Sequence, residues 1–304
     1  MDMANHVIAA SAALLEQMRN HYASDITEHL PAGALFVAKR PGCTITAYRS
    51  GKVLFQGKAA EQEAAKWLEP SEQKKAAAPQ PRLSAASAIG SDEVGTGDYF
   101  GPVVVAAAYV AKEQIETIVA MGVKDSKQLT DEAIRRIAPA LMNHIAHQTV
   151  ILANQKYNDW QRSGMPQTKI KALLHNKAIA MLMERLSPIK PEAIIIDQFI
   201  ERDLYFRYLE GETNIVRDRV YCYPKAETVH IAVAAASIIA RYVFLQEMER
   251  LSQKVGMTLP KGAGAQVDQA AAKLMQMHGP AILELCGKLH FANTKKAVQI
   301  AKQQ

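Results

Sequence analysis

Two adjacent carboxylates followed by a glycine pair are the first feature of this sequence that could do chemistry. Asp92 and Glu93 follow the apolar start of a predicted strand, and Gly95 and Gly97 come next, in the stretch SDEVGTGDYFG. Adjacent side chains in a regular strand point to opposite faces of the sheet. For both carboxylates to reach one site, we expect the strand to end or bend at Glu93, with the glycines supplying that freedom. Taken alone, the stretch also fits a solvated acidic strand end before a turn.

Two further carboxylates lie where other predicted elements begin or end. Asp197 ends the apolar run AIIID, at the edge of an open sheet where ligands usually bind. A carboxylate there has to be solvated, paired or bound to a metal. Glu227 lies in the first turn of a predicted alanine-rich helix, where the helix dipole favours a negative charge. Taken one at a time, Asp197 also fits a residue that starts a turn, and Glu227 a residue that stabilises a helix start.

Considered together, the four carboxylates indicate a site for divalent cations. Mg²⁺ prefers oxygen ligands and uses a few carboxylates together with phosphate oxygens of the substrate. Two such ions about 4 Å apart can activate a water molecule and stabilise the leaving oxygen of a phosphoryl displacement. The sequence has no CxxC pair for zinc, no GxxxxGK[ST] phosphate loop and no GxSxG motif. The histidines are scattered, and we predict that His175 and His230 are helix residues rather than ligands.

Composition and charge exclude several classes of protein. The 304 residues carry 36 Lys and Arg and 30 Asp and Glu, and this net charge of +6 fits a phosphate-bearing partner without establishing one. The apolar runs at 101–111 and 231–240 are shorter than the ~18–20 residues that span a bilayer. The N-terminus lacks the basic start of a secretory signal, and the three widely spaced cysteines are expected to be reduced thiols. We therefore expect a cytoplasmic protein with no membrane contact.

The chain divides into two predicted domains joined by a linker. Residues 1–69 are expected to form an N-terminal domain, an antiparallel meander with helices over one face. Its helices are predicted over 5–22 and 59–69, and its strands over 34–40, 44–50 and 52–57. Residues 70–88 are rich in Pro, Ala and basic residues without apolar periodicity, and they predict a linker.

Residues 89–304 alternate strands with helices, which predicts an α/β domain with a mixed sheet flanked by helices. Its strands are predicted over 88–94, 102–110, 149–154, 193–197 and 214–221, and its helices over 168–186, 228–250 and 266–286. Thr130 is predicted to cap a further helix that has Asp131 and Glu132 in its first turn.

Several segments of the chain resemble ribonuclease HIII, a bacterial relative of ribonuclease HII. They are IGSDEVGTGDYFGPVVVAAAYV (89–110), VKDSKQLT (123–130), LLHNKAI (173–179), IIIDQF (194–199), KAETVHIAVAAASIIAR (225–241) and KLHFANTKKA (288–297). In addition, TITAYRSGKVLFQG (44–57) is similar to the extra N-terminal domain of that family. Ribonuclease HII tends to carry DEAGRG and a final Asp after a Lys-Gly pair. Val94, Thr96 and Ala226-Glu227 stand at those places here, which favours ribonuclease HIII.

The resemblance implies that residues 89–304 form a catalytic domain with a ribonuclease H-like fold. It also implies that residues 1–69 form a small substrate-binding α+β domain similar to the TATA-binding-protein fold. It implies an endonuclease that hydrolyses the RNA strand of RNA–DNA hybrids, leaving 5′-phosphate and 3′-hydroxyl ends, with Mg²⁺ or Mn²⁺ as cofactor. Asp92, Glu93 and Asp197 would bind the metal, and Glu227 would hold the second ion or the attacking water. We expect the protein to act as a monomer.

Further residues are candidates for substrate contact. The resemblance places Gly95, Thr96 and Gly97 in a turn beside the scissile phosphate, where backbone groups can meet the ribose 2′-OH that separates RNA from DNA. Lys127, in the DSK block, would contact a backbone phosphate. Four basic residues of the N-terminal meander could grip a duplex or be solvated surface residues: Lys39, Arg40, Arg49 and Lys52.

Two alternative functions stay open. One is the excision of single embedded ribonucleotides, as in ribonuclease HII, and the other is the binding of hybrids without cleavage.

Overall fold

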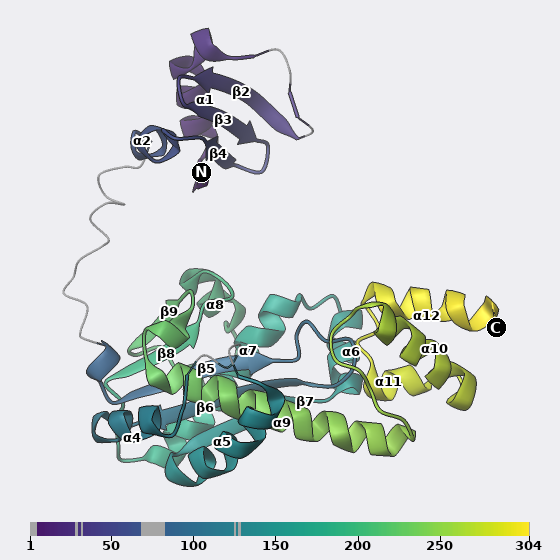
Figure 1. Cartoon of the computed structure of the whole chain (residues 1–304). Coiled ribbons are helices and arrows are strands. Elements are labelled where there is room, and N and C mark those ends of the chain that lie inside the picture. The colour runs from purple at the N-terminus through teal and green to yellow at the C-terminus, as the bar shows by residue number, and fades with distance from the viewer. Residues whose placement is uncertain are drawn as a thin grey trace. The chain divides into compact units, whose positions relative to one another are not determined.

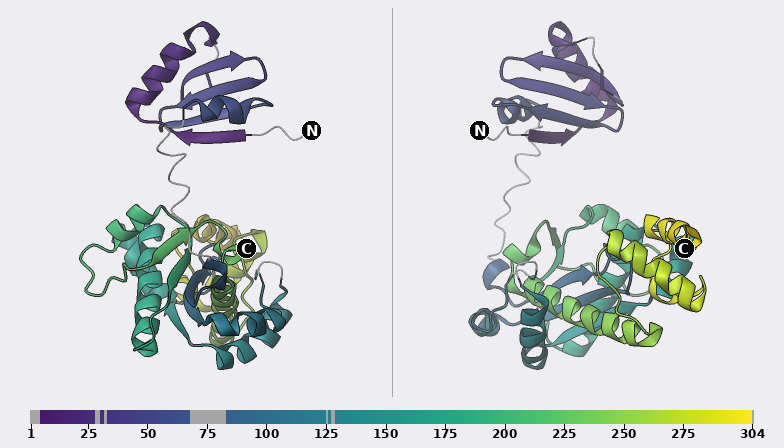
Figure 2. Two further views of the ribbon diagram at one scale, coloured as in Figure 1. Left: turned by 90° about the vertical axis from the view of Figure 1, so that its left-hand side faces the viewer. Right: turned by 45° about the vertical axis from the view of Figure 1, so that its right-hand side comes forward.

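A computed structural model describes residues 5–27, 30–31, 33–67, 83–124, 126 and 129–303. Their contacts group into two compact units, Met1–Gln80 and Pro81–Gln304, each with its own hydrophobic core (Figures 1 and 2). The predicted linker, 70–88, lies outside the described residues as far as residue 82. Beyond it, Leu83–Ala85 form a short 3-10 helix (η2) in which Leu83 is buried, and Ala88 begins a strand. Residues 83–88 are therefore structured parts of the second unit.

The first unit is an antiparallel sheet with two helices over one of its faces. Its strand order is β1-β4-β3-β2. The elements are β1 (Asn5–Ala9), α1 (Ala12–His21), β2 (Ala34–Arg40), β3 (Cys43–Tyr48), β4 (Lys52–Gln56) and α2 (Ala60–Ala65). Phe36, Ile45 and Phe55 pack under the helices against Met18 and Tyr22.

One predicted helix of this unit was wrong at its start. Residues 5–9 form a strand, and the helix begins only at Ala12. Ser11 ends the extended segment by accepting a hydrogen bond from the N–H of Leu14 at 3.2 Å. The free edge of β4 supplies a backbone ladder for residues 5–9, with Val7 opposite Leu54. This tertiary pairing outweighs the local pattern from which a helix was predicted.

The second unit is a mixed five-stranded sheet in the order β7-β6-β5-β8-β9. Strand β5 pairs with β6 antiparallel and with β8 parallel, β6 and β7 are antiparallel, and β8 and β9 are parallel. The strands are β5 (Ala88–Val94), β6 (Val103–Val110), β7 (His147–Leu152), β8 (Ala193–Asp197) and β9 (Val220–Tyr223). The expected mixed sheet is confirmed.

The fifth strand of this sheet starts later than predicted. It was expected over 214–221, but β9 begins at Val220. The Asn176 side chain binds the chain just before it, donating to the carbonyl of Asn214 at 2.7 Å and accepting from the N–H of Val216 at 3.0 Å. Arg219 then has a positive φ of 55°, which a strand does not allow.

Helices cover both faces of the second sheet (Figure 1). On one face α9 (Ile231–Val255) packs with α5 (Asp131–His144), and on the other lies α7 (Gln167–Leu186). The remaining helices are α4 (Ile115–Ala120), α6 (Asn154–Arg162), α8 (Arg202–Tyr208), α10 (Ala265–His278), α11 (Ile282–Cys286) and α12 (Ala292–Gln303). Thr130 caps α5 as expected, accepting from the N–H of Ala133 at 3.2 Å.

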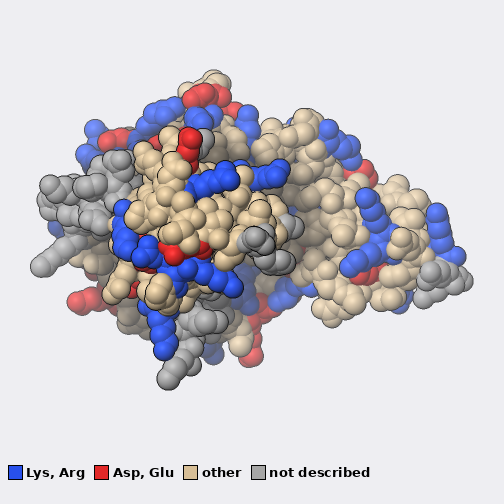
Figure 3. Space-filling view, turned by 90° about the horizontal axis from the view of Figure 1, so that it is seen from above, with Lys and Arg blue, Asp and Glu red and all other residues tan. Residues whose placement is uncertain are grey.

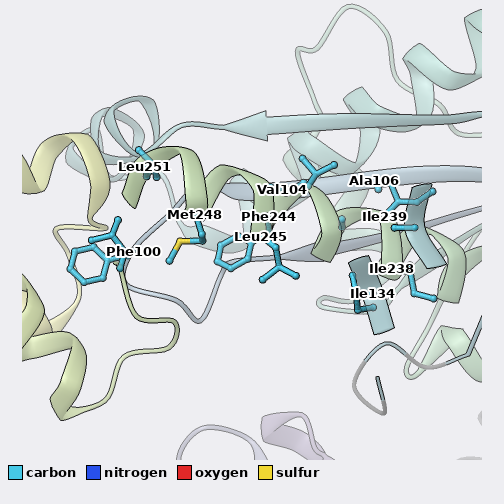
Figure 4. Close-up of a cluster of buried hydrophobic side chains, with 14 of the residues drawn as sticks. Phe100, Val104, Ala106, Ile134, Ile238, Ile239, Phe244, Leu245, Met248 and Leu251 are labelled. Carbon is cyan, nitrogen blue, oxygen red and sulfur yellow. The ribbon is translucent and has the colours of Figure 1, made fainter. Parts of the chain in front are cut away.

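Helix α9 lies close against the sheet because its residues and those beneath it are small. A Cβ added at Gly90 would lie 2.2 Å from the backbone of Ala232 and Val233, so glycine permits this approach. Figure 4 shows Ile239 and Phe244 of α9 among the buried side chains of this core. Helix α9 is long and apolar enough to span a membrane, but 72% of its apolar window is buried inside the protein. It is the core helix of this unit.

A buried lysine ties the C-terminal segment to the loop that follows β5. The Lys288 side chain is fully buried, and its Nζ donates to the carbonyls of Asp98 at 2.8 Å and Gly101 at 2.5 Å. Gly101 O also accepts from Asn154 Nδ2 at 2.9 Å. Burial lowers the pKa of Lys288 to about 7.

We expect the stability of the protein to rise with pH more steeply than that of the Lys288→Met variant. Between the folded pKa of about 7 and the ordinary value of 10.5, the unfolded chain binds the proton that the folded chain has released. The free energy of unfolding should therefore rise with pH, by at most about 1.4 kcal/mol per pH unit for one proton. Urea denaturation at pH 7, 8 and 9 measures both slopes, and equal slopes would show that Lys288 keeps its ordinary pKa.

Candidate active site

Strand β5 carries Asp92 and Glu93 to opposite faces of the second sheet. The strand does not bend at Glu93, since Glu93 and Val94 still pair with β6. Asp92 lies on the α9 face, where it hydrogen-bonds with Ser237. Glu93 lies on the α7 face, where its Oε2 is 2.9 Å from Nε2 of His175. The expected bend was therefore wrong, because the partner strand extends past both carboxylates.

Asp92 and Asp197 lie side by side at the ends of two parallel strands. Ser91 is opposite Ile196 in the β5–β8 register, and Asp92 and Asp197 are the next residues of the two strands. Burial raises the pKa of Asp92 to about 7, and the negative charges of Glu93 and Asp197 add to the rise. Hydrogen bonds from Ser237 and from the N–H of Glu93, at 2.7 Å, oppose it. A cation placed beside both Asp side chains would remove this repulsion.

Glu227 comes to the same end of β8, but from a different element than predicted. It lies in a 3-10 helix (η5, Ala226–Thr228), whereas α9 starts only at Ile231. The two are separate because His230 caps α9, its Nδ1 accepting from the N–H of Ala232 at 3.0 Å. The N–H of Ala226 donates to Asp197 Oδ1 at 3.0 Å, which fixes η5 beside that carboxylate.

Three polar residues of α7, spaced four apart, face this end of β5. Gln167 Nε2 donates to the carbonyl of Thr96 at 3.0 Å. Lys171 forms an ion pair with Glu93 Oε1, and His175 contacts Oε2. Although burial acts in the opposite direction, the hydrogen bonds and charges of His175 and Lys171 lower the pKa of Glu93. We did not predict Gln167 or Lys171, and we took His175 for an ordinary helix residue. Their spacing at i, i+4 and i+8 could have indicated them, because it places three polar side chains on one face of a largely buried helix.

The turn after β5 combines a strained position with an open one. Gly95 has a φ of +95°, and a Cβ there would lie 2.2 Å from the carbonyl oxygen of Pro102. Gly97 is exposed, and a Cβ there would meet nothing within 4 Å. Lys127, the expected phosphate contact, lies outside the described residues. Its neighbour Ser126 shares a hydrogen bond of 2.6 Å with Ser237, the residue that binds Asp92.

The carboxylates fit a hard divalent cation by their chemistry. Within the described part of the chain, no three His, Cys, Asp or Glu side chains are gathered as a ready metal-ligand group. Asp92 and Asp197 are adjacent and the segment of Glu227 is fixed beside them, whereas Glu93 is turned to α7. All four offer oxygen ligands, and the charge repulsion at Asp92 is what a divalent cation would relieve.

Comparisons with known proteins show the family of the chain. A family model described as Ribonuclease HII matches residues 89–294. The ribonuclease HIII of Geobacillus sp. (strain WCH70) is 82% identical over 301 residues, which cover 99% of this chain and 100% of that protein. The chain belongs to the ribonuclease HIII family. The ribonuclease HIII of Bacillus subtilis (strain 168) is 52% identical over 312 residues, 99% of each chain. A model described as Domain of unknown function (DUF3378) matches residues 5–80.

Solved structures share the fold of this chain. The crystal structure of Bst-RNase HIII in complex with Mn²⁺ is 62% identical, with a TM-score of 0.73, and covers 99% of this chain and 100% of that chain. Aquifex aeolicus RNase H3 is 23% identical with a TM-score of 0.53 over 93% of this chain and 99% of its own, a likeness of fold alone. The ribonuclease H-like fold and the assignment as a ribonuclease H enzyme are therefore confirmed.

The four candidate basic residues of the N-terminal sheet lie in different places. Lys39 and Lys52 are exposed on the face of the sheet away from the core. Lys39 is opposite Thr44 of β3, which in turn is opposite Gln56 of β4. Gln56 and Lys52 are four residues apart on β4, so their side chains point to the same face. Arg49 is exposed in the turn after β3. In the space-filling view, Lys and Arg form several separate groups with acidic side chains among them (Figure 3).

Arg40 differs from the other three basic residues because it is engaged within its own unit. It lies at the end of β2 on the same side as the core, opposite the buried Cys43. Its guanidinium is 3.6 Å from Asp25 and 4.0 Å from Glu63. Glu63 belongs to α2, which packs on this face, and Asp25 directly precedes Ile26, which forms a β-bridge with Ala38 of β2.

Proposed function

We propose that this protein hydrolyses the RNA strand of RNA–DNA hybrids with two divalent metal ions at the ends of β5 and β8. The observation that carries the proposal is the pair Asp92 and Asp197, adjacent on one face, with the pKa of Asp92 raised to about 7. A relative at 62% identity has been crystallised with Mn²⁺, which supports Mg²⁺ or Mn²⁺ as the cofactor. Asp92, Glu93 and Asp197 would hold metal, and Glu227 would hold the second ion or the attacking water.

The chain's own groups prepare the carboxylates for this reaction. Bound divalent ions supply positive charge to the phosphate and lower the pKa of water. Ser237 and the N–H of Glu93 orient the Asp92 carboxylate, and the N–H of Ala226 orients that of Asp197. Attack of water on phosphorus with departure of the O3′ atom would leave 5′-phosphate and 3′-hydroxyl ends.

Substrate contacts are proposed on both units. Gly97 is exposed and Gly95 leaves no room for a side chain, so the turn of Gly95, Thr96 and Gly97 can present its backbone to ribose. Lys127 would contact a phosphate of the same duplex. On the N-terminal unit, the exposed Lys39, Arg49 and Lys52 would contact the backbone of the hybrid, and Arg40 would act mainly through Asp25 and Glu63.

We propose that the enzyme acts as a monomer in the cytoplasm. All four carboxylates are supplied by one chain, which supports catalysis by a single copy. The free cysteines Cys43, Cys222 and Cys286 suit a reducing compartment.

We expect metal-dependent cleavage of a hybrid with a continuous RNA strand, and no cleavage of duplex DNA of the same sequence. Replacing the 2′-hydroxyls around the cut site by 2′-O-methyl groups should stop cleavage there, because the methyl group blocks approach to the Gly95–Gly97 turn. Gel analysis of end-labelled strands in Mg²⁺ and in Mn²⁺ measures this. Equal cleavage of the methylated hybrid would exclude the turn as the reader. Preferential cleavage of a duplex with one embedded ribonucleotide would favour the ribonuclease HII-like activity instead.

A further inference from the structure

We propose that Lys171 competes with the divalent cation for Glu93 and thereby weakens metal binding at the carboxylate site. This inference rests on the proposed metal site and adds a residue that sets its affinity.

Lys171 is held in place inside the protein rather than spread on its surface. Its side chain is 13% exposed and that of Glu93 is 12% exposed, and the two form an ion pair. The Lys171 ammonium also lies 4.2 Å from the ring centroid of Phe199. That ring in turn stacks on His175, with the ring centroids 5.1 Å apart. An ammonium on an aromatic face is favourably placed, so the position of Lys171 is fixed from two sides.

Both carboxylate oxygens of Glu93 are engaged by side chains of α7. Oε1 is held by Lys171 and Oε2 by His175, whose Nδ1 is 2.7 Å from Ser91 Oγ. Each oxygen keeps a second lone pair, but a cation that binds Oε1 would lie beside the Lys171 ammonium.

The aspartates of the site are held differently. Asp92 accepts from Ser237 and from the N–H of Glu93, and Asp197 accepts from the N–H of Ala226. These donors are neutral and leave the negative charge of each aspartate available to a cation. Lys171 instead brings a positive charge onto Glu93, and like charges repel strongly in a partly buried site.

The competing explanation is that Lys171 only positions Glu93 for the metal. The two explanations predict opposite changes in metal affinity when Lys171 is removed. If Lys171 positions Glu93, its removal weakens metal binding; if Lys171 competes, its removal strengthens it.

The test is the affinity of the full-length protein for Mn²⁺ alone, measured by calorimetry and by the electron paramagnetic resonance signal of free Mn²⁺. We expect Lys171→Met to bind Mn²⁺ at least tenfold more tightly than the wild type, because a competing charge is removed. Lys171→Arg keeps the charge and should stay within about threefold of the wild type. Lys177→Met is the matched control, since Lys177 lies on the same helix, is exposed and loses the same charge.

The outcomes decide between competition by Lys171 and positioning by Lys171. Unchanged or weaker Mn²⁺ binding in Lys171→Met overturns the competition, and so does an equal gain in Lys177→Met. Lys171→Gln is the second neutral variant if Lys171→Met does not fold, as judged by circular dichroism. Asp197→Asn should remove the Mn²⁺ binding of the wild type. If it does and Lys171→Met is unchanged, the inference alone fails; if it does not, the proposed metal site fails and the inference with it.

Discussion

Asp92→Asn and Asp197→Asn should each lower the turnover of hybrid cleavage at least ~1,000-fold, equivalent to about 4 kcal/mol of transition-state stabilisation. Each change keeps the size of the side chain and removes one metal-binding charge from the adjacent pair on β5 and β8. Loss of a catalytic ion removes the charge that stabilises both the attacking and the leaving oxygen. Single-turnover cleavage of an all-RNA hybrid in saturating Mg²⁺ measures the effect.

Two controls separate lost chemistry from lost structure. Binding of the uncleaved hybrid should change little, because the phosphate contacts proposed for both units remain. Asp218→Asn removes a carboxylate that is 88% exposed and should cleave as well as the wild type. Variants of Asp92 or Asp197 that keep more than about a tenth of the wild-type turnover would contradict the metal assignment.

The Asn substitution at Asp92 should not destabilise the fold when no metal is added. Burial and the neighbouring carboxylates raise the pKa of Asp92 from its ordinary 3.8 to about 7, so the folded chain holds a proton that the unfolded chain loses. The stability supplied by that proton falls as the pH rises from about 4 to 7. Above pH 7 the charged Asp92 is a cost in the folded state, which a neutral Asn avoids. Thermal denaturation at pH 8 provides the check on folding for the turnover experiment.

The sequence predicted β5 and β8 of the second sheet well because most of each strand is buried. Strand β5 occupies 88–94 as expected, and β8 occupies 193–197. Each begins with four buried apolar or small residues, 88–91 and 193–196, which is typical of central strands. The partly exposed end of the sheet was less predictable. The start of β9 depends on a side chain of α7, Asn176, that binds the loop before it.

The residues of the site were predictable from the sequence, but the faces of the sheet to which their side chains point were not. Asp92, Asp197 and Glu227 could be chosen from residue type and position at the ends of predicted elements. Whether Glu93 points to the same side as Asp92 depends on how far β6 accompanies β5, a long-range pairing that no local pattern contains. Likewise, the ion pair of Lys171 with Glu93 could be recognised only after α7 is placed on the face to which Glu93 points.

Deleting residues 1–80 should raise the KM for hybrid at least tenfold, roughly 1.4 kcal/mol of lost binding, while kcat falls much less. The second unit, Pro81–Gln304, has its own core and contains all four proposed metal-binding carboxylates. The N-terminal unit offers Lys39 and Lys52 on the face of its sheet that is away from its core. Binding that is equal in the ground state and the transition state lowers KM without raising kcat.

Salt dependence gives this deletion a second, independent measurement. Each lysine that neutralises a phosphate releases counterions, so losing such contacts flattens the fall of affinity with salt. The truncated enzyme should show a smaller slope than the full chain, and Lys39→Gln with Lys52→Gln an intermediate one. Arg40→Gln is the comparison within the same unit, and its slope should stay closer to that of the full chain because Asp25 and Glu63 already engage this charge. A truncated enzyme that folds, keeps its KM and loses kcat would mean that the N-terminal unit shapes the active site instead of gripping the substrate.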